Sequence, residues 1–136
     1  MPRFVPFLQE GISLNSWSAN TVEAKALRWG NVEDLESLSF YPDLILVSDC
    51  IYYEASVEPL ISTLKALSHQ NPECVILLSY EVRDYLESKQ KIAKEFFRAV
   101  GQHFRIVPKS TDECHEDYAS DDIRVIQLVF QCKNAE

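Results

Sequence analysis

Two apolar stretches decide the fold class of this chain: PDLILVSD at residues 42–49 and CVILL at residues 74–78. Each contains at least four consecutive apolar residues, and such short runs are typical of strands buried on both faces of a sheet. The segment between them begins with Ser56 and Pro59, residues typical of a helix start. Its apolar residues recur at helical spacing: Val57, Leu60, Ile61, Leu64 and Leu67. A strand, a helix and a second strand in this order predict a parallel pair in an α/β fold.

The rest of the chain continues this alternation. We expect the last two strands to pair antiparallel, because the polar, acid-rich connection at residues 109–122 has little helical period. The further predicted elements are a helix at residues 5–14, a strand at 21–28 ended by Gly30, a loop or short helical turn at 34–41, a helix at 86–100 ended by Gly101, and strands at 104–107 and 123–132.

Composition narrows the possible functions. The chain has 136 residues, which suits a single domain over residues 1–136, and 46% of them are apolar, enough for a core. Its formal net charge of −8 argues against nucleic-acid binding, which needs a basic surface. This charge is compatible with a basic protein partner and equally with solubility alone.

Targeting and metal signals are weak. No run approaches the roughly 20 apolar residues of a membrane span, and the start of the chain lacks the pattern of a signal peptide. The four cysteines, Cys50, Cys74, Cys114 and Cys132, form no C-x-x-C pair. We therefore expect reduced thiols, no metal site, and a cytoplasmic or also nuclear protein.

Acids and aromatic residues follow both central strands. In open α/β sheets ligands bind beyond the carboxyl ends of the strands, where DCIYY (residues 49–53) and SYEVR (residues 79–83) fall. A carboxylate beside aromatic rings can hold a lysine ammonium by charge and cation–π attraction. The alternative is structural, because an acid often caps a turn and a tyrosine is often a half-buried core residue.

These segments resemble the seven-β-strand protein-lysine methyltransferases. DCIYY is similar to the acid-x-x-Tyr signature after their fourth strand, and AKALRWG (residues 24–30) resembles the third strand and Trp-Gly step of the methyltransferase-like 21 group. Further matching segments are residues 42–49, 58–60, 63–65, 80–83 and 118–123. The resemblance covers residues 4 to about 130 and implies a Rossmann-like, class I fold with sheet order 3-2-1-4-5-7-6.

The resemblance also implies roles for single residues. Transfer of a methyl group from S-adenosylmethionine to a lysine ε-amine is the expected reaction. The group members that these segments resemble most densely act on valosin-containing protein, so a AAA+ ATPase chaperone of that type is the expected partner. The implied residues are Asp49 and Tyr52 for catalysis, Trp29, Ser48 and Asp49 for the cofactor, and Tyr53, Tyr80, Glu81 and Arg83 for the protein substrate.

One part of the family pattern is absent from the sequence. The family binds the cofactor with a Gly-x-Gly turn after its first strand, but the three glycines here, Gly11, Gly30 and Gly101, stand far apart. Residues 4–9 resemble the helix after the family's second strand, so we expect a domain without strands 1 and 2. Three readings stay open: an inactive or impaired portion of a lysine methyltransferase, a non-catalytic interaction module, and an unrelated small α/β domain.

Overall fold

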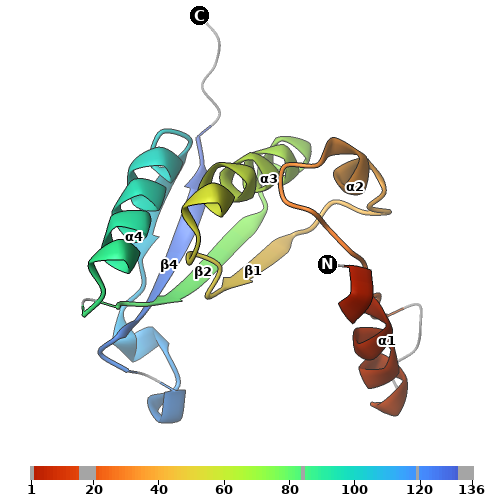
Figure 1. Ribbon diagram of the computed structural model, residues 1–136, viewed down its shortest axis with the longest axis horizontal. Coiled ribbons are helices and arrows are strands. Elements are labelled where there is room, and N and C mark those ends of the chain that lie inside the picture. The colour runs from red at the N-terminus through yellow and green to blue at the C-terminus, as the bar shows by residue number, and fades with distance from the viewer. Residues whose placement is uncertain (1, 16–20, 84, 119, 132–136) are drawn as a thin grey trace, which may run out of the picture.

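The structure is a computed structural model that describes residues 2–15, 21–83, 85–118 and 120–131. Helices and strands alternate along most of it, joined by short 3-10 turns (Figure 1). The helices are α1 (Val5–Leu14), α2 (Val32–Glu36), α3 (Val57–Gln70) and α4 (Glu87–Val100), and the strands are β1 (Leu44–Ser48), β2 (Val75–Glu81), β3 (Phe104–Pro108) and β4 (Ile123–Phe130). The predicted alternation of the central and C-terminal elements is confirmed.

The four strands form one sheet with the order β1-β2-β4-β3. β1 and β2 are parallel, with Ser48 opposite Ser79 at their carboxyl ends. β4 runs antiparallel to both of its neighbours, β2 and β3, so the predicted antiparallel pairing of the last two strands is confirmed. This order is the one expected for strands 4, 5, 7 and 6 of the methyltransferase sheet.

The core lies on one face of this sheet. Figure 1 shows α3 and α4 side by side across the strands. Their apolar faces meet alternate residues of the strands, which is why α3 and α4 carry apolar residues three and four positions apart. The fully buried apolar side chains are Ile61 and Leu64 of α3, Phe96 and Val100 of α4, Ile76 and Leu78 of β2, Phe104 of β3 and Leu128 of β4.

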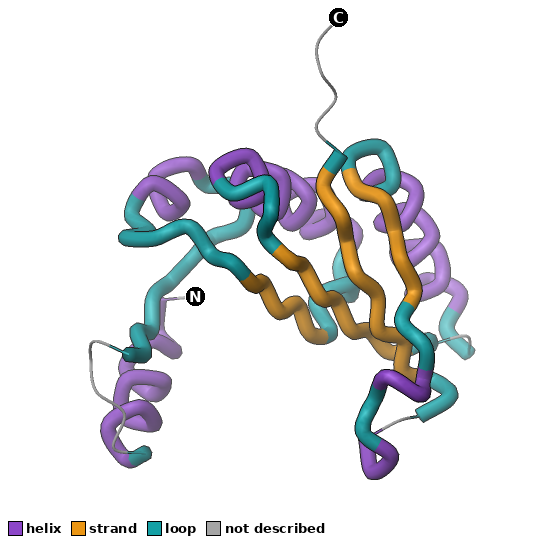
Figure 2. The backbone as a smooth tube through the Cα atoms, turned by 180° about the vertical axis from the view of Figure 1, so that it is seen from behind, coloured by secondary structure: helices purple, strands orange, loops and turns teal. Residues whose placement is uncertain are grey.

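The prediction that both faces of the central strands are buried is wrong for the face of the sheet opposite the helices. Residues 44–47 and 74–78 were expected to form strands buried on both faces, but no helix of the described segments covers this face, which Figure 2 shows in front. Leu46 is therefore 71% exposed and Val75 is 37% exposed, whereas Val47 and Ile76 are buried beneath the helices. An apolar run identifies a strand but does not tell whether both of its faces are covered.

A second correction concerns residues 21–28. They form no strand; after a turn at Thr21 the chain runs without regular structure to a turn at Trp29 and Gly30. A strand is stabilised by hydrogen bonds to a neighbour, and β1, at the edge of the sheet, pairs only with β2 among the described strands. The predicted strand at residues 123–132 ends at Phe130, and Cys132 lies outside the described residues.

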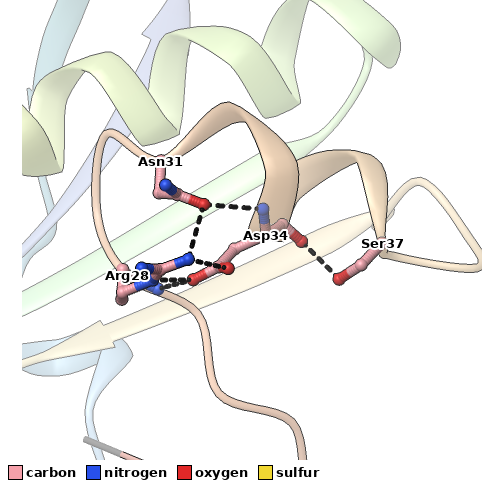
Figure 3. A network of polar contacts seen from close by, with 4 residues as sticks. All are labelled: Arg28, Asn31, Asp34 and Ser37. Carbon is pink, nitrogen blue, oxygen red and sulfur yellow. Dashed lines mark hydrogen bonds and ion pairs between the residues drawn. The ribbon is translucent and has the colours of Figure 1, made fainter.

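Side-chain hydrogen bonds join the end of the irregular segment to α2 (Figure 3). Arg28 donates two hydrogen bonds from its guanidinium to the two carboxylate oxygens of Asp34, at 2.8 and 2.9 Å. Asn31 caps α2 by accepting from the backbone N–H of Asp34 at 2.8 Å. Gly30 then donates its N–H to the hydroxyl of the buried Thr63 on α3, at 2.8 Å. These contacts place Trp29 beside α3 without a strand.

Candidate active site

The site is built at the carboxyl ends of β1 and β2. The two strands stay in register up to Ser48 and Ser79, and the N–H of Asp49 donates to the carbonyl of Ser79 at 3.0 Å. The segments after the two strands therefore leave the sheet side by side, as expected for the ligand-binding edge of an α/β sheet. The predicted site residues Asp49, Glu81 and Arg83 come together here.

Arg83 joins the two acids. Its guanidinium lies 3.0 Å from Asp49 Oδ2 and 2.7 Å from Glu81 Oε2. The hydrogen bond to Glu81, with the charge of Asp49, raises the pKa of Arg83 further above its usual value. Asp49, Glu81 and Arg83, here called the acid–arginine triad, thus carry one net negative charge. Arg83 uses one oxygen of each carboxylate, which leaves the second oxygen of each for another donor.

Asp49 adopts an unusual backbone conformation. Its φ of 48° is in the left-handed region, and it is the one non-glycine residue with a positive φ among the described positions. Aspartate tolerates this region better than most residues because its short polar side chain bonds locally. The turn lets the chain leave β1 sharply while the Asp49 carboxylate reaches Arg83 on the next strand's extension.

A cavity of about 730 Å³ opens beside the triad between β2 and α4. We call it the β2–α4 cavity. The ring of Tyr80 forms part of its wall and packs against Phe97 with their centroids 5.0 Å apart. The complete lining is Ile51, Tyr80, Glu81, Val82, Arg83, Lys89, Gln90, Ala93, Lys94 and Phe97. It combines apolar walls with one acid, Glu81, and three bases, Arg83, Lys89 and Lys94.

A second cavity, of about 570 Å³, borders the segment that follows β1. We call it the Trp29 cavity, and both Trp29 and Tyr52 line it. Its lining is mainly apolar and includes Phe4 and Leu8 from the N-terminal segment and Pro59 from α3. Five of the eight predicted site residues therefore line a cavity, with Trp29 and Tyr52 in this one and Tyr80, Glu81 and Arg83 in the β2–α4 cavity.

Three predicted site residues line neither cavity. Ser48 is exposed and its hydroxyl accepts from Ser79 at 3.4 Å, at the strand ends. Tyr53 is 64% exposed and its ring meets that of Tyr52 edge-on, with centroids 4.7 Å apart. Asp49 is also absent from both linings but is tied to the β2–α4 cavity through Arg83.

Lys89 is a site residue that the sequence did not reveal. Its ammonium group donates to the carbonyl of Tyr52 at 2.7 Å and lies 5.6 Å from the centre of the Tyr53 ring. Lys89 belongs to the first turn of α4, far along the chain from Tyr52, and nothing in the helix pattern distinguished it from the neighbouring lysines. It links α4 to the segment between β1 and α3, which contributes lining residues to both cavities.

The cofactor implied by the resemblance fits this chain only in part. The half-buried ring of Trp29, in a mainly apolar cavity, can stack against a planar nucleobase. The glycines needed for close approach of the backbone to the rest of such a cofactor are not at the strand ends, because Gly11 lies in α1, Gly30 follows Trp29 and Gly101 follows α4. No group of three or more His, Cys, Asp or Glu that could hold a metal ion occurs among the described residues.

The paired carboxylates lie at the carboxyl edge of the mixed sheet, the edge at which open α/β sheets bind their ligands. A family model described as lysine methyltransferase matches residues 1–103. Protein-lysine N-methyltransferase EFM6 of Saccharomyces cerevisiae is 28% identical over 137 aligned positions, which cover 93% of this chain and 52% of the yeast protein. The chain belongs to the lysine methyltransferase family, and it spans about half the length of the curated relative that it matches.

Two further findings bear on the environment of the chain. No helix in the described ranges is long and apolar enough to cross a membrane. Cys50, Cys74 and Cys114 are free thiols, and burial raises the pKa of both Cys50 and Cys74 above the usual value.

Proposed function

We propose that this chain forms the lysine-binding part of a protein-lysine N-methyltransferase that uses S-adenosylmethionine. The acid–arginine triad beside the β2–α4 cavity is the observation that carries the proposal. Its net negative charge lies at the carboxyl edge of the sheet, where an incoming lysine ammonium would bind. Membership of the lysine methyltransferase family supports the same reaction class.

The residues around the triad suit a lysine substrate in three ways. Asp49 Oδ1 and Glu81 Oε1 are not used by Arg83 and can accept hydrogen bonds from an amine. Tyr80 and Phe97 supply aromatic walls for the aliphatic part of the side chain. Because only a neutral amine can accept a methyl group, the site must orient the amine while its proton leaves to solvent or to a carboxylate.

We assign the Trp29 cavity to the cofactor. Trp29 would stack on the nucleobase and Tyr52 would close the opposite wall, with Ser48 and Asp49 at the adjoining strand end. S-adenosylmethionine supplies an electrophilic methyl group when bound. Since the sequence contains no Gly-x-Gly turn, we propose that the anchors for the ribose and methionine groups lie outside residues 1–136, and that these residues alone bind the cofactor weakly or not at all.

The protein partner is proposed from the resemblance of single segments. The runs at residues 58–60, 63–65 and 80–83 favour the methyltransferase-like 21 members that act on valosin-containing protein. A AAA+ ATPase chaperone of that type, in the cytoplasm or also the nucleus, is therefore the proposed substrate.

Calorimetric titration with S-adenosylmethionine tests the cofactor assignment. We expect binding by the chain preceded by the N-terminal part of a lysine methyltransferase that carries the Gly-x-Gly turn, and none or weak binding by residues 1–136 alone. Trp29→Ala in the extended chain should weaken binding, whereas Trp17→Ala, outside the described residues, serves as the tryptophan control.

The alternative is a non-catalytic module that uses the same cavity to hold a partner. The missing Gly-x-Gly turn favours it. If the extended chain also fails to bind S-adenosylmethionine, while residues 1–136 still retain a AAA+ chaperone in a pull-down, the module replaces the enzyme. Micromolar binding by residues 1–136 alone would instead contradict our account of the cofactor anchors.

A further inference from the structure

The two sides of the β2–α4 cavity differ in charge. Glu81 and Arg83 of the acid–arginine triad form the side at the end of β2, and Asp49, outside the lining, is bound to Arg83. The opposite side is a face of α4 that carries Lys89 and Lys94. This basic face stands out in a chain whose formal net charge is −8.

Helical geometry determines which lysines of α4 face the cavity. Residues 89, 90, 93, 94 and 97 recur at the spacing of one helix face, and all of them line the cavity. Lys91 lies on the same helix but is absent from the lining and is exposed. The chain therefore contains a matched pair of exposed lysines, Lys94 on the cavity and Lys91 away from it.

The two cavity lysines differ in their contacts. Lys89 already donates to the carbonyl of Tyr52 and lies over the ring of Tyr53. Lys94 has no hydrogen-bond or ion-pair partner among the described residues, and it lines the cavity while remaining exposed to solvent. A cation without an internal partner on a cavity wall is available to an anionic group of a ligand.

We infer that the β2–α4 cavity selects protein segments in which the target lysine is accompanied by a nearby acidic residue. The target ammonium binds at the triad, and the acidic side chain binds at Lys94 on the facing wall. A cavity of about 730 Å³ has room for more than a single lysine side chain, so both groups of one segment can enter together. This inference rests on the proposed function and adds to it the class of substrate sequence.

Electrostatic complementarity of this kind acts mainly on specificity. An exposed ion pair contributes at most about 1 kcal/mol, which corresponds to about a fivefold change in affinity. A segment with a second basic residue in place of the acidic one meets repulsion at Lys94 instead of attraction.

The test measures binding of fluorescent peptides to the 136-residue chain by anisotropy, without cofactor. Three peptides of equal length carry a lysine with a nearby glutamate, the same lysine with glutamine in place of the glutamate, or norleucine in place of the lysine with the glutamate kept. We expect the lysine–glutamate peptide to bind about fivefold more tightly than the lysine–glutamine peptide.

Two charge reversals on α4 test whether Lys94 causes the preference for the glutamate peptide. Lys94→Glu should abolish or reverse the preference for glutamate, and Lys91→Glu should leave it unchanged, although both alter the net charge equally. Thermal unfolding of both variants checks that α4 is intact.

Each outcome bears on a different claim. Equal binding of the glutamate and glutamine peptides, equal effects of the two reversals, or no binding of any peptide would overturn the inference. If the norleucine peptide binds as tightly as the lysine peptide, recognition of lysine itself fails, and the proposed function fails with it.

Discussion

The N-terminal segment, residues 2–41, and the segment from α3 to β4, residues 57–130, use similar apolar side chains in opposite ways. In the second segment Phe96 and Phe104 are completely or almost completely buried between the helices and the sheet. In the first, Phe7 is 69% exposed and Phe40 is 60% exposed. Burial depends on having a layer to pack against, and in the described residues the two layers of the core are formed by β1 and the segment from α3 to β4.

The difference also separates the two cavities. The β2–α4 cavity is built by elements of the core, so its walls are fixed by β2 and α4. The Trp29 cavity has one wall from α3 and one from the N-terminal segment, which is joined to the core by the Gly30–Thr63 hydrogen bond. We therefore expect lysine recognition to be more robust than cofactor binding in residues 1–136.

The largest loss of stability is expected from a substitution in the core. Phe96→Ala removes a fully buried ring and should lower the free energy of unfolding by about 3–5 kcal/mol, measured by urea denaturation. Phe7→Ala in the exposed part of α1 should change it by less than about 0.5 kcal/mol. Similar losses for both variants would mean that α1 is packed against the core in solution.

A substitution at Gly30 tests the contact between the N-terminal segment and α3. Its φ of +77° is in the left-handed region, and an added Cβ would lie 3.4 Å from Pro59, an ordinary contact distance. Gly30→Ala should therefore cost about 1–2 kcal/mol through backbone strain alone. Gly11→Ala, where a Cβ meets nothing within 4 Å and the residue is helical, is the control and should not lower stability. Equal stability of both variants would show that the Trp29 turn is not formed.

A pH titration of Asp34 tests the network of hydrogen bonds among Arg28, Asn31 and Asp34. The hydrogen bond from the Arg28 side chain, followed by that from the Arg28 backbone, lowers the pKa of Asp34 from 3.8 to about 2. Since the folded pKa lies below the unfolded one, the network contributes stability above about pH 4 and loses it as the pH falls toward 2. An NMR titration of the Asp34 carboxyl group should have its midpoint near 2, and Arg28→Met should return it toward 3.8. A normal midpoint in the unaltered chain would contradict the network.

The smallest effect on stability is expected on the open face of the sheet. Leu46→Lys places a charge where the side chain is already 71% exposed, and stability should change by less than about 0.5 kcal/mol. Light scattering should fall, because a charge on an apolar edge strand opposes association. Val47→Lys, one residue along and buried, is the contrast and should unfold the chain. A large loss from Leu46→Lys would indicate that another copy or segment covers this face.

Much of the fold could be predicted because the signals were local. The apolar runs at residues 44–47 and 74–78 and the helical spacing of Val57, Leu60 and Leu64 predicted β1, β2 and α3 correctly. The position of Asp49, Glu81 and Arg83 at one edge of the sheet followed from the rule that ligands bind at the ends of parallel strands.

Some features depended on contacts that no local pattern carries. Residues 21–28 alternate apolar and polar side chains, yet they form no strand without a neighbouring strand to pair with. Lys89 reaches the carbonyl of Tyr52 only because the first turn of α4 lies beside the segment that follows β1, and these residues are far apart along the chain. The sequence by itself determined which segments become strands and helices, since side-chain periodicity and backbone preference are properties of neighbouring residues. Tertiary structure alone decided which faces are covered, which lysines face the cavity and which acids share Arg83, because these depend on distances between segments that fold together.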